Sequence, residues 1–246
     1  MAQIVNEDRN PVLVALDLPT AERASLLARD LAPYVGGFKV GLELLTGPGP
    51  RVIGVLARLG KPVFADAKLH DIPNTVRAAA RHLGSAGARW VTAHASGGRA
   101  MLEAAVEGMA EGAGTRPAGI LAITVLTSLD KESLAETGVV ATPGRLAAKR
   151  ARLAADSGCE GVITSVKELT VVSDIAPGLL TVVPGIRPPG VSRHDQVRIA
   201  SPSEALCRGA DYLVIGRGIT KAQDPVEASR AILADMAGVR SAHGAG

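Results

Sequence analysis

The chain has 246 residues, of which 47% are hydrophobic and only 2% aromatic, and its formal net charge is +3. This length suits one α/β barrel, with a core built mainly from Ala, Val, Leu and Ile. The 27 Lys and Arg residues are scattered, so no basic run marks a nucleic-acid-binding surface. The sequence has no run of about 18 consecutive apolar residues, the length that a membrane span needs. We therefore expect neither a nucleic acid nor a membrane as a partner.

The cysteines and the first residues bear on the compartment. Cys159 and Cys207 have no CxxC partner and no metal-ligand spacing, and we expect both to be buried free thiols. Residues 1–11 lack the apolar segment of a signal peptide. Free thiols suit a reducing environment, so we expect a cytoplasmic protein.

Short apolar runs rich in β-branched residues recur along the chain and predict strands at 12–16, 37–41, 62–68, 90–94, 119–126, 161–165, 179–186 and 212–216. Segments rich in Ala, Leu, Arg and Glu lie between them and predict helices at about 20–33, 48–59, 73–87, 97–112, 143–158, 166–175, 201–209 and 224–237. Many of these helical segments begin at a cap residue or a proline and end near a glycine. The polar stretch 127–142 is expected to form a lid or a short helix.

The regular alternation of strands and helices predicts βαβ units and a parallel sheet. Eight such units in about 250 residues match the size of a TIM (β/α)8 barrel. The alternative is an open doubly wound sheet, which usually has a glycine-rich turn after its first strand. Here that strand ends in ALDLP, without glycine, so we favour the barrel. Since no Pro/Ser-rich linker interrupts the chain, we expect residues 1–246 to form a single catalytic domain with a short flexible tail from about 238.

Polar groups end nearly every predicted strand. The active site of such a barrel lies at the carboxyl ends of its strands. Those ends carry Asp17, Lys39, Asp66, Lys68, His94, Thr127, Ser165, Arg187 and Arg217. One polar strand end is ordinary because strand ends meet solvent, but a ring of them predicts a common pocket.

The densest charges lie in VFADAKLHDIP, residues 63–73. Asp66 and Lys68 are two residues apart, so both side chains point to one side of an extended strand. Asp71 follows in the loop, and Lys39 adds a second cation if its strand lies alongside. Unit charges at about 4 Å attract by roughly 4 kcal/mol at an effective dielectric of 20. These charged residues form either a preorganised catalytic array or a structural ion-pair network. For His70 and His94 too, both a catalytic and a structural role are open.

The last two strand ends have the composition of an anion site. PGIR ends at Arg187, and IGR ends at Arg217. Glycines let backbone N–H groups approach a phosphate, which an arginine can bind bidentately. Phosphate sites after strands seven and eight recur in this fold. Residues 188–196, PPGVSRHDQ, are expected to close over a ligand.

Taken in order, these motifs resemble the orotidine 5′-phosphate decarboxylase family over about residues 12–232. DAKLHDIPNT at 66–75 is similar to the family signature DxKxxDIPxT, and the motifs ALD, KVG, HASGG, TVLTS, PGIR, DQ and IGR occur in the family order. The resemblance implies a barrel enzyme that converts orotidine 5′-monophosphate to UMP and carbon dioxide in pyrimidine biosynthesis. It also implies that no metal or organic cofactor takes part.

The resemblance further implies residue roles. Lys68 would donate a proton to carbon 6 of the pyrimidine, Asp66 would lie near the departing carboxylate, and Lys39 would join the charge network. Asp71 and Thr75 would be shared across a homodimer interface, with Asp71 completing the array. The implied substrate-binding residues are Asp17 and Lys39 at the ribose, Thr127 and Ser128 at the pyrimidine, Arg187 and Gln196 at the closing loop, and Gly216 and Arg217 at the phosphate.

Two alternatives remain. Metal-dependent sugar-phosphate decarboxylases and hexulose-phosphate synthases share the barrel and a DxKxxD motif. In a member of those enzymes we would expect an acidic residue near position 39, to help bind the metal, and no DIPxT continuation. Lys39 would repel a divalent cation. A non-catalytic nucleotide-phosphate-binding barrel is the other alternative, and it would not need the Asp66, Lys68 and Asp71 array.

Overall fold

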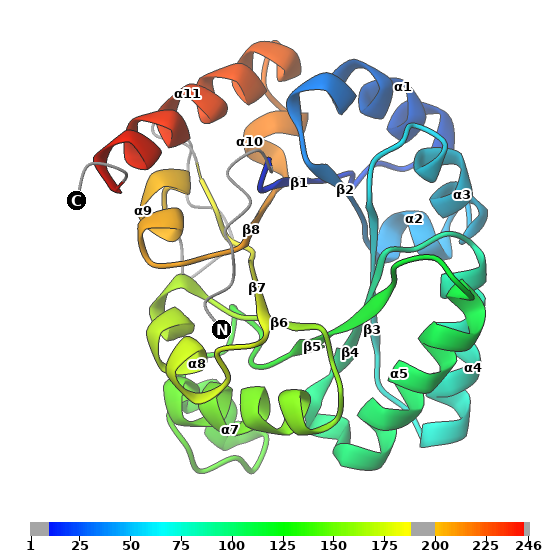
Figure 1. The fold of residues 1–246 in the computed structure, drawn as a ribbon, viewed down its shortest axis with the longest axis vertical. Helices are drawn as coiled ribbons and strands as arrows, with labels where there is room; N and C mark the ends of the chain where they lie inside the picture. Colours follow the sequence, from blue (N-terminus) through cyan, green and yellow to red (C-terminus); the bar gives the residue numbers. More distant parts are fainter. Residues whose placement is uncertain (1–9, 188–199, 244–246) are drawn as a thin grey trace.

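The computed structural model describes residues 10–187 and 200–243. Within them, the strands close into a parallel barrel in chain order, and β8 pairs with β1. Figure 1 looks down this barrel and shows the helices arranged as a ring outside the strands. The predicted TIM barrel is therefore confirmed, and the open sheet is excluded.

Each strand overlaps a predicted run. They are β1 (Val12–Ala15), β2 (Gly37–Val40), β3 (Val63–Leu69), β4 (Trp90–His94), β5 (Gly119–Ile123), β6 (Gly161–Ile163), β7 (Leu180–Val183) and β8 (Tyr212–Ile215). Strands β5 and β7 each end three residues before the predicted end. The helices that match predicted segments are α1 (Ala21–Leu31), α3 (Arg51–Ala57), α4 (Pro73–Ser85), α5 (Arg99–Ala113), α7 (Pro143–Asp156), α8 (Leu169–Ile175), α9 (Pro202–Cys207) and α11 (Pro225–His243). Helix α11 continues past the predicted helix end at 237, and the flexible tail from about 238 stays a prediction. A single glycine costs a helix only about 1 kcal/mol, so Gly238 need not end it.

Several short elements complete the barrel. Helix α6 (Lys131–Glu136) lies in the polar stretch 127–142 and confirms a short helix there. Asp130 caps it by accepting a hydrogen bond of 2.8 Å from the backbone N–H of Ser133. The remaining short elements are α2 (Leu42–Thr46), α10 (Arg217–Thr220), η1 (Ala32–Tyr34), η2 (Ala95–Gly97) and η3 (Val166–Glu168).

The alternation of side chains along each strand produces two cores. One fills the barrel interior and contains Leu13, Ala15, Phe64, Trp90, Leu121, Val182, Tyr212 and Val214. Trp90 and Tyr212 meet there edge to face, with ring centroids 5.0 Å apart. The other core lies between the strands and the helices. The interior core forms the floor beneath the carboxyl ends of the strands, where the site lies.

The two cysteines differ in their exposure. Cys159 is buried but Cys207 is exposed, so the expectation of two buried thiols is wrong for Cys207, which ends the short helix α9 on its solvent side. Burial raises the pKa of the Cys159 thiol to about 12.

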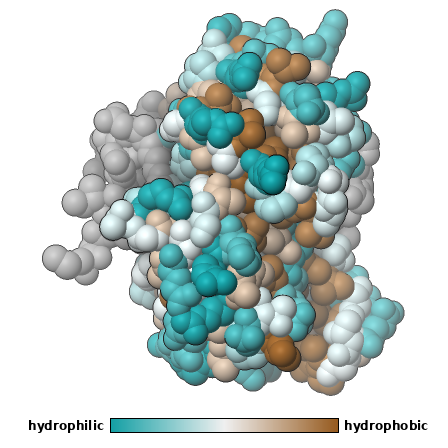
Figure 2. Space-filling view, turned by 90° about the vertical axis from the view of Figure 1, so that its right-hand side faces the viewer, coloured by the Kyte–Doolittle hydropathy of each residue, from teal (hydrophilic) through white to brown (hydrophobic). Residues whose placement is uncertain are grey.

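Hydrophobic residues lie among hydrophilic ones on the face that Figure 2 shows. Within the described residues, no helix has the length and apolar character needed to cross a membrane.

Candidate active site

A cavity of about 500 Å³ lies at the carboxyl ends of the strands. Its charged and polar lining consists of Asp17, Lys39, Glu43, Asp66, Lys68, Thr127, Arg187, Arg217 and Lys221. Its remaining lining consists of Ala15, Phe64, Ile123, Val125, Leu126, Ile163, Pro184, Gly185, Val214 and Gly216. The predicted common pocket is therefore present, and it holds most of the residues that the strand ends indicated.

The period of two along the strands places the charges in this cavity. Ala15 belongs to the interior core, and Asp17 follows it by two positions on the same side. Phe64 and Asp66 are related in the same way in β3. The register pairs Ala15 with Lys39 and Lys39 with Phe64. Three neighbouring strands thus direct their charged ends to one wall of the cavity.

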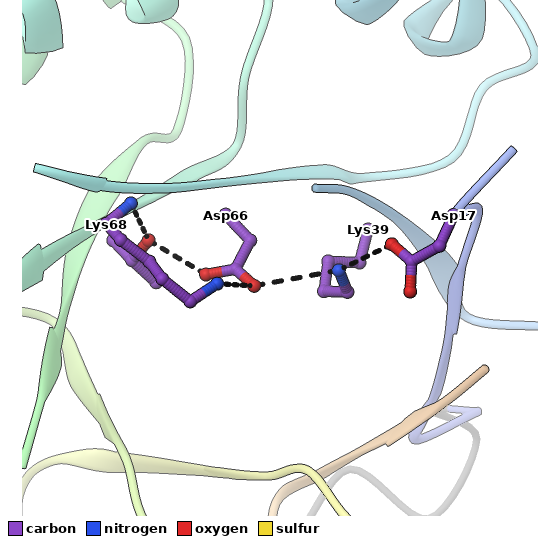
Figure 3. Close-up of polar contacts among 5 residues, drawn as sticks. Asp17, Lys39, Asp66 and Lys68 are labelled. Atoms are coloured by element: carbon purple, nitrogen blue, oxygen red, sulfur yellow. Dashed lines mark hydrogen bonds and ion pairs between the residues drawn. The ribbon is translucent and has the colours of Figure 1, made fainter. Parts of the chain in front are cut away.

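The side chains on this wall alternate in sign, as Figure 3 shows. Lys39 Nζ lies 3.1 Å from Asp17 Oδ1 and 3.6 Å from Asp66 Oδ2. Lys68 Nζ lies 2.6 Å from the same Asp66 oxygen. A Cβ atom at Gly41 would come within 2.8 Å of Asp17 Oδ1 and 2.9 Å of Lys39 Nζ. A glycine at position 41 therefore leaves room for the pair.

Asp66 is the carboxylate that links the two lysines. Burial by itself would raise the pKa of its carboxyl. The charges of Lys39 and Lys68, with hydrogen bonds from Lys68 and Thr92, outweigh burial and lower that pKa below its ordinary value. Asp66 is thus ionised at neutral pH, and both ammonium groups are held by one fixed negative charge.

The backbone at Lys68 departs from the extended strand that the sequence indicated. Its φ is +52°, and Lys68 alone among the described non-glycine residues has a positive φ. The pairing of β3 with β4 shifts between Ala65 and Leu69, which marks a bulge. A left-handed L-residue costs roughly 1–2 kcal/mol. Local strain is therefore concentrated at the residue whose ammonium group faces the cavity.

Two signature residues lie outside this cavity. Asp71 and Thr75 are exposed, on the loop after β3 and in the first turn of α4, and neither is among the lining residues. The Asp71 carboxylate accepts a hydrogen bond of 2.6 Å from the backbone N–H of Ile72. Among the described residues, Asp71 therefore makes no ion pair with Lys68 of the same chain.

Other predicted residues fall in different places. Ser128 and Ser165 are not among the residues that line the cavity, and the Ser165 hydroxyl contacts the Glu168 carboxylate instead. Gln196, in the proposed closing loop, lies outside the described residues.

The His94 ring is 5.4 Å from that of His70. Burial, followed by the nearby charges of His70 and Lys68, lowers the pKa of His94, which favours a neutral packing ring.

Basic groups gather on the wall formed by β7 and β8. Arg187 is buried, and its guanidinium donates to the carbonyl of Ile186 at 2.9 Å. Gly185 has a φ of +80°, a conformation that favours glycine. Arg217 begins α10, and Lys221 follows it by one helical turn. These groups form a cationic wall suited to a phosphate.

Three further residues that the sequence motifs did not indicate belong to the site or support it. Glu43 and Lys221 line the cavity, and Thr92 supports Asp66 from below. Lys221 stands at i+4 from Arg217, a helical spacing that could have revealed it. Thr92 lies two residues after Trp90 and two before His94, so a reading of the inward row of β4 would have indicated it.

The fold and this site define an enzyme of the (β/α)8-barrel class, with its reactive groups at the strand carboxyl ends. A family model described as the orotidine 5′-phosphate decarboxylase / HUMPS family matches residues 10–232. The chain belongs to this family.

Individual relatives agree with the family match. A protein of Anaeromyxobacter sp. (strain K) named orotidine 5′-phosphate decarboxylase is 47% identical over 226 residues, which cover 92% of this chain and 97% of the relative. One of Moorella thermoacetica with the same name is 46% identical over 233 residues, covering 93% and 92%. The crystal structure of orotidine 5′-phosphate decarboxylase from Lactobacillus acidophilus superposes with a TM-score of 0.81 at 36% identity, covering 92% of this chain and 99% of that chain.

Proposed function

We propose that this chain catalyses the decarboxylation of orotidine 5′-monophosphate to UMP and carbon dioxide, a step of pyrimidine biosynthesis. The observation that carries the proposal is the alternating array of Lys39, Asp66 and Lys68 in a cavity that also has a cationic wall. The names of the most similar relatives support the same activity.

The array suits the chemistry of this reaction. When the bond from carbon 6 to the carboxylate breaks, its electron pair remains on the ring carbon as carbon dioxide leaves. A fixed ammonium group beside that carbon stabilises the developing charge more than it stabilises the starting carboxylate. Lys68 then donates a proton to carbon 6, which gives UMP, and the resulting amine regains a proton from water. Asp66 holds Lys68 in position throughout.

The remaining predicted residues bind the substrate. Asp17 and Lys39 are proposed to contact the ribose, and Thr127 the pyrimidine together with Ser128. Gly216 and Arg217 are proposed to hold the phosphate, with Arg187 and Gln196 contributed by the segment that closes over it. Binding of this remote phosphate supplies free energy that can be used to close the site around the reacting ring.

We propose a homodimer in which Asp71 and Thr75 reach the partner's cavity. Their exposure outside the cavity of their own chain supports this assignment. Cys159 and Cys207 are free thiols, which suits the proposed cytoplasmic location.

The proposed activity is tested with purified protein treated with a chelator. Loss of orotidine 5′-monophosphate absorbance at an undiminished rate after chelation is the expected result, because Lys39 occupies the space between two carboxylates where a divalent cation would be repelled. Within the described residues, no three His, Cys, Asp or Glu side chains form a group able to hold a metal ion. Activity on a sugar phosphate that depends on added magnesium would favour the metal-dependent relatives instead.

Arg217→Ala tests the phosphate wall. We expect kcat/KM to fall by about 100-fold, because each hydrogen bond to a charged group contributes about 1.5–3 kcal/mol. UMP affinity should fall in parallel, whereas affinity for uridine, which lacks the phosphate, should not change. Arg208→Ala is the control, since Arg208 is an exposed arginine paired with Glu204 at 3.3 Å outside the cavity. Equal losses for UMP and uridine would contradict the phosphate assignment.

A further inference from the structure

Thr92 lies in β4 beneath the charged wall and is fully buried, with 0% exposure. Its hydroxyl donates a hydrogen bond of 3.0 Å to Asp66 Oδ1. The same hydroxyl accepts a hydrogen bond of 2.8 Å from the backbone N–H of Lys68. A hydroxyl has one donor and two acceptor sites, so it can make both bonds at once. Thr92 therefore contacts the carboxylate and the backbone of the two central residues.

The contact with the backbone N–H of Lys68 lies at an interruption in the pairing of β3 with β4. The ladder pairs Ala65 with Val91 and resumes with Leu69 and Ala93, so Thr92 lies opposite the bulge in β3. At this interruption, the Thr92 side chain supplies an acceptor to the N–H of Lys68. Lys68 adopts its left-handed conformation at the same place. The side-chain hydroxyl thus takes part in holding the backbone that aims Lys68 into the cavity.

The contact with the carboxylate of Asp66 restrains that group. One oxygen of Asp66 accepts from Thr92, while the other faces Lys68 at 2.6 Å and Lys39 at 3.6 Å. With both oxygens engaged on opposite sides, the carboxylate is restrained from rotating about its last torsion. The position of the Lys68 ammonium group then depends on a hydroxyl that lies outside the cavity lining, whereas Lys39 is also held by Asp17 at 3.1 Å.

We propose that Thr92 is a positioning residue for the decarboxylation, acting on the reacting carbon only through Asp66 and Lys68. The inference rests on the proposed function, since it concerns the same cavity. Thr92 is not among the residues that line the cavity, so its hydroxyl contributes to the rate of the chemical step and not to nucleotide binding.

The test compares Thr92→Val with Thr92→Ser. Valine keeps the shape of threonine but can neither donate nor accept, whereas serine keeps the hydroxyl. For Thr92→Val, kcat should fall by about 100-fold, the loss expected when a reacting group is displaced by about 1 Å. The Kd of UMP should change by less than about threefold, because the ribose and phosphate contacts remain. Thr92→Ser should restore kcat to within about threefold of the parent protein.

Thr181 provides a matched control. It is a buried threonine in β7, and its hydroxyl likewise contacts an aspartate, donating to Asp211 Oδ2 at 2.9 Å and accepting from the Asp211 backbone N–H at 3.1 Å. Thr181→Val removes the same kinds of hydrogen bond near the amino-terminal end of its strand, away from Lys68. It should lower thermal stability much as Thr92→Val does, while kcat stays at the parent value.

The outcomes separate the hypotheses. If the parent protein is inert toward orotidine 5′-monophosphate, the proposed function fails. If the parent is active and Thr92→Val retains its kcat, or Thr92→Ser loses as much as Thr92→Val, the positioning role fails. If Thr92→Val does not fold, Thr92→Ala offers the same comparison without a branched side chain, with circular dichroism as the check of folding.

Discussion

Lys68→Ala should abolish turnover while leaving the nucleotide site intact. We expect kcat to fall by at least about 10⁴-fold, because the variant loses both a proton donor and a fixed positive charge beside the reacting carbon. UMP has no carboxylate at carbon 6, so its affinity should stay within about tenfold of the parent value. Steady-state decarboxylation and UMP titration measure the two quantities.

Two further variants sharpen this result. Lys68→Arg keeps the charge, but guanidinium is larger than ammonium and does not give up its proton in proteins, so it should be nearly as inactive as the alanine variant. Lys131→Ala removes an exposed lysine of α6 and should retain full turnover. Near-normal kcat in Lys68→Ala, with UMP still bound, would remove Lys68 from the proposed mechanism.

Asp71→Ala should also lose activity, by about 10³-fold, if its carboxylate completes the charged array of a partner subunit. The decisive result is complementation. In a heterodimer of Lys68→Ala and Asp71→Ala chains, one site has both defects and the other has none. With random pairing in a symmetric dimer, co-expression of the two inactive chains should restore about a quarter of the parent activity.

Asn74→Ala serves as the control for complementation. Asn74 is exposed in the same turn as Asp71 and Thr75, but it is not one of the proposed site residues. The Asn74→Ala chains keep both Lys68 and Asp71. When they are co-expressed with Lys68→Ala chains, they should therefore be active whichever chain they pair with. Absence of any regain in the Lys68→Ala and Asp71→Ala pair, or a fully active monomer in light scattering, would contradict the sharing of Asp71.

The barrel and most of its pocket could be predicted because both follow from local pattern. Strands spaced by helices define the barrel, and the period of two sends residues such as Asp17, Lys39 and Asp66 to the same side as the interior core. Since all strands are parallel, their polar ends must meet at one end of the barrel. No long-range contact has to be known for that inference.

The remaining features depend on contacts that local pattern does not specify. The bulge at Lys68 and its support by Thr92 depend on how β3 and β4 align. The exposure of Cys207 depends on which side of α9 faces the barrel. The proposed role of Asp71 involves a second subunit, about which the spacing within one chain carries no information.

The packed aromatic residues at the base of the barrel restrict how molecules enter and leave the cavity. Phe64, Trp90 and Tyr212 are almost fully buried beneath the cavity, and Arg89 stacks on Trp90 at 4.6 Å from below. The described part of the chain thus forms a chamber filled at its base. This packed base closes the barrel interior to the nucleotide, to carbon dioxide and to the proton that returns to Lys68, and the cavity lies on the other side of it, at the strand ends. The proposed phosphate-binding residues Gly216 and Arg217 lie at the same strand ends, so under the proposed function carbon dioxide leaves past the bound nucleotide or after its departure.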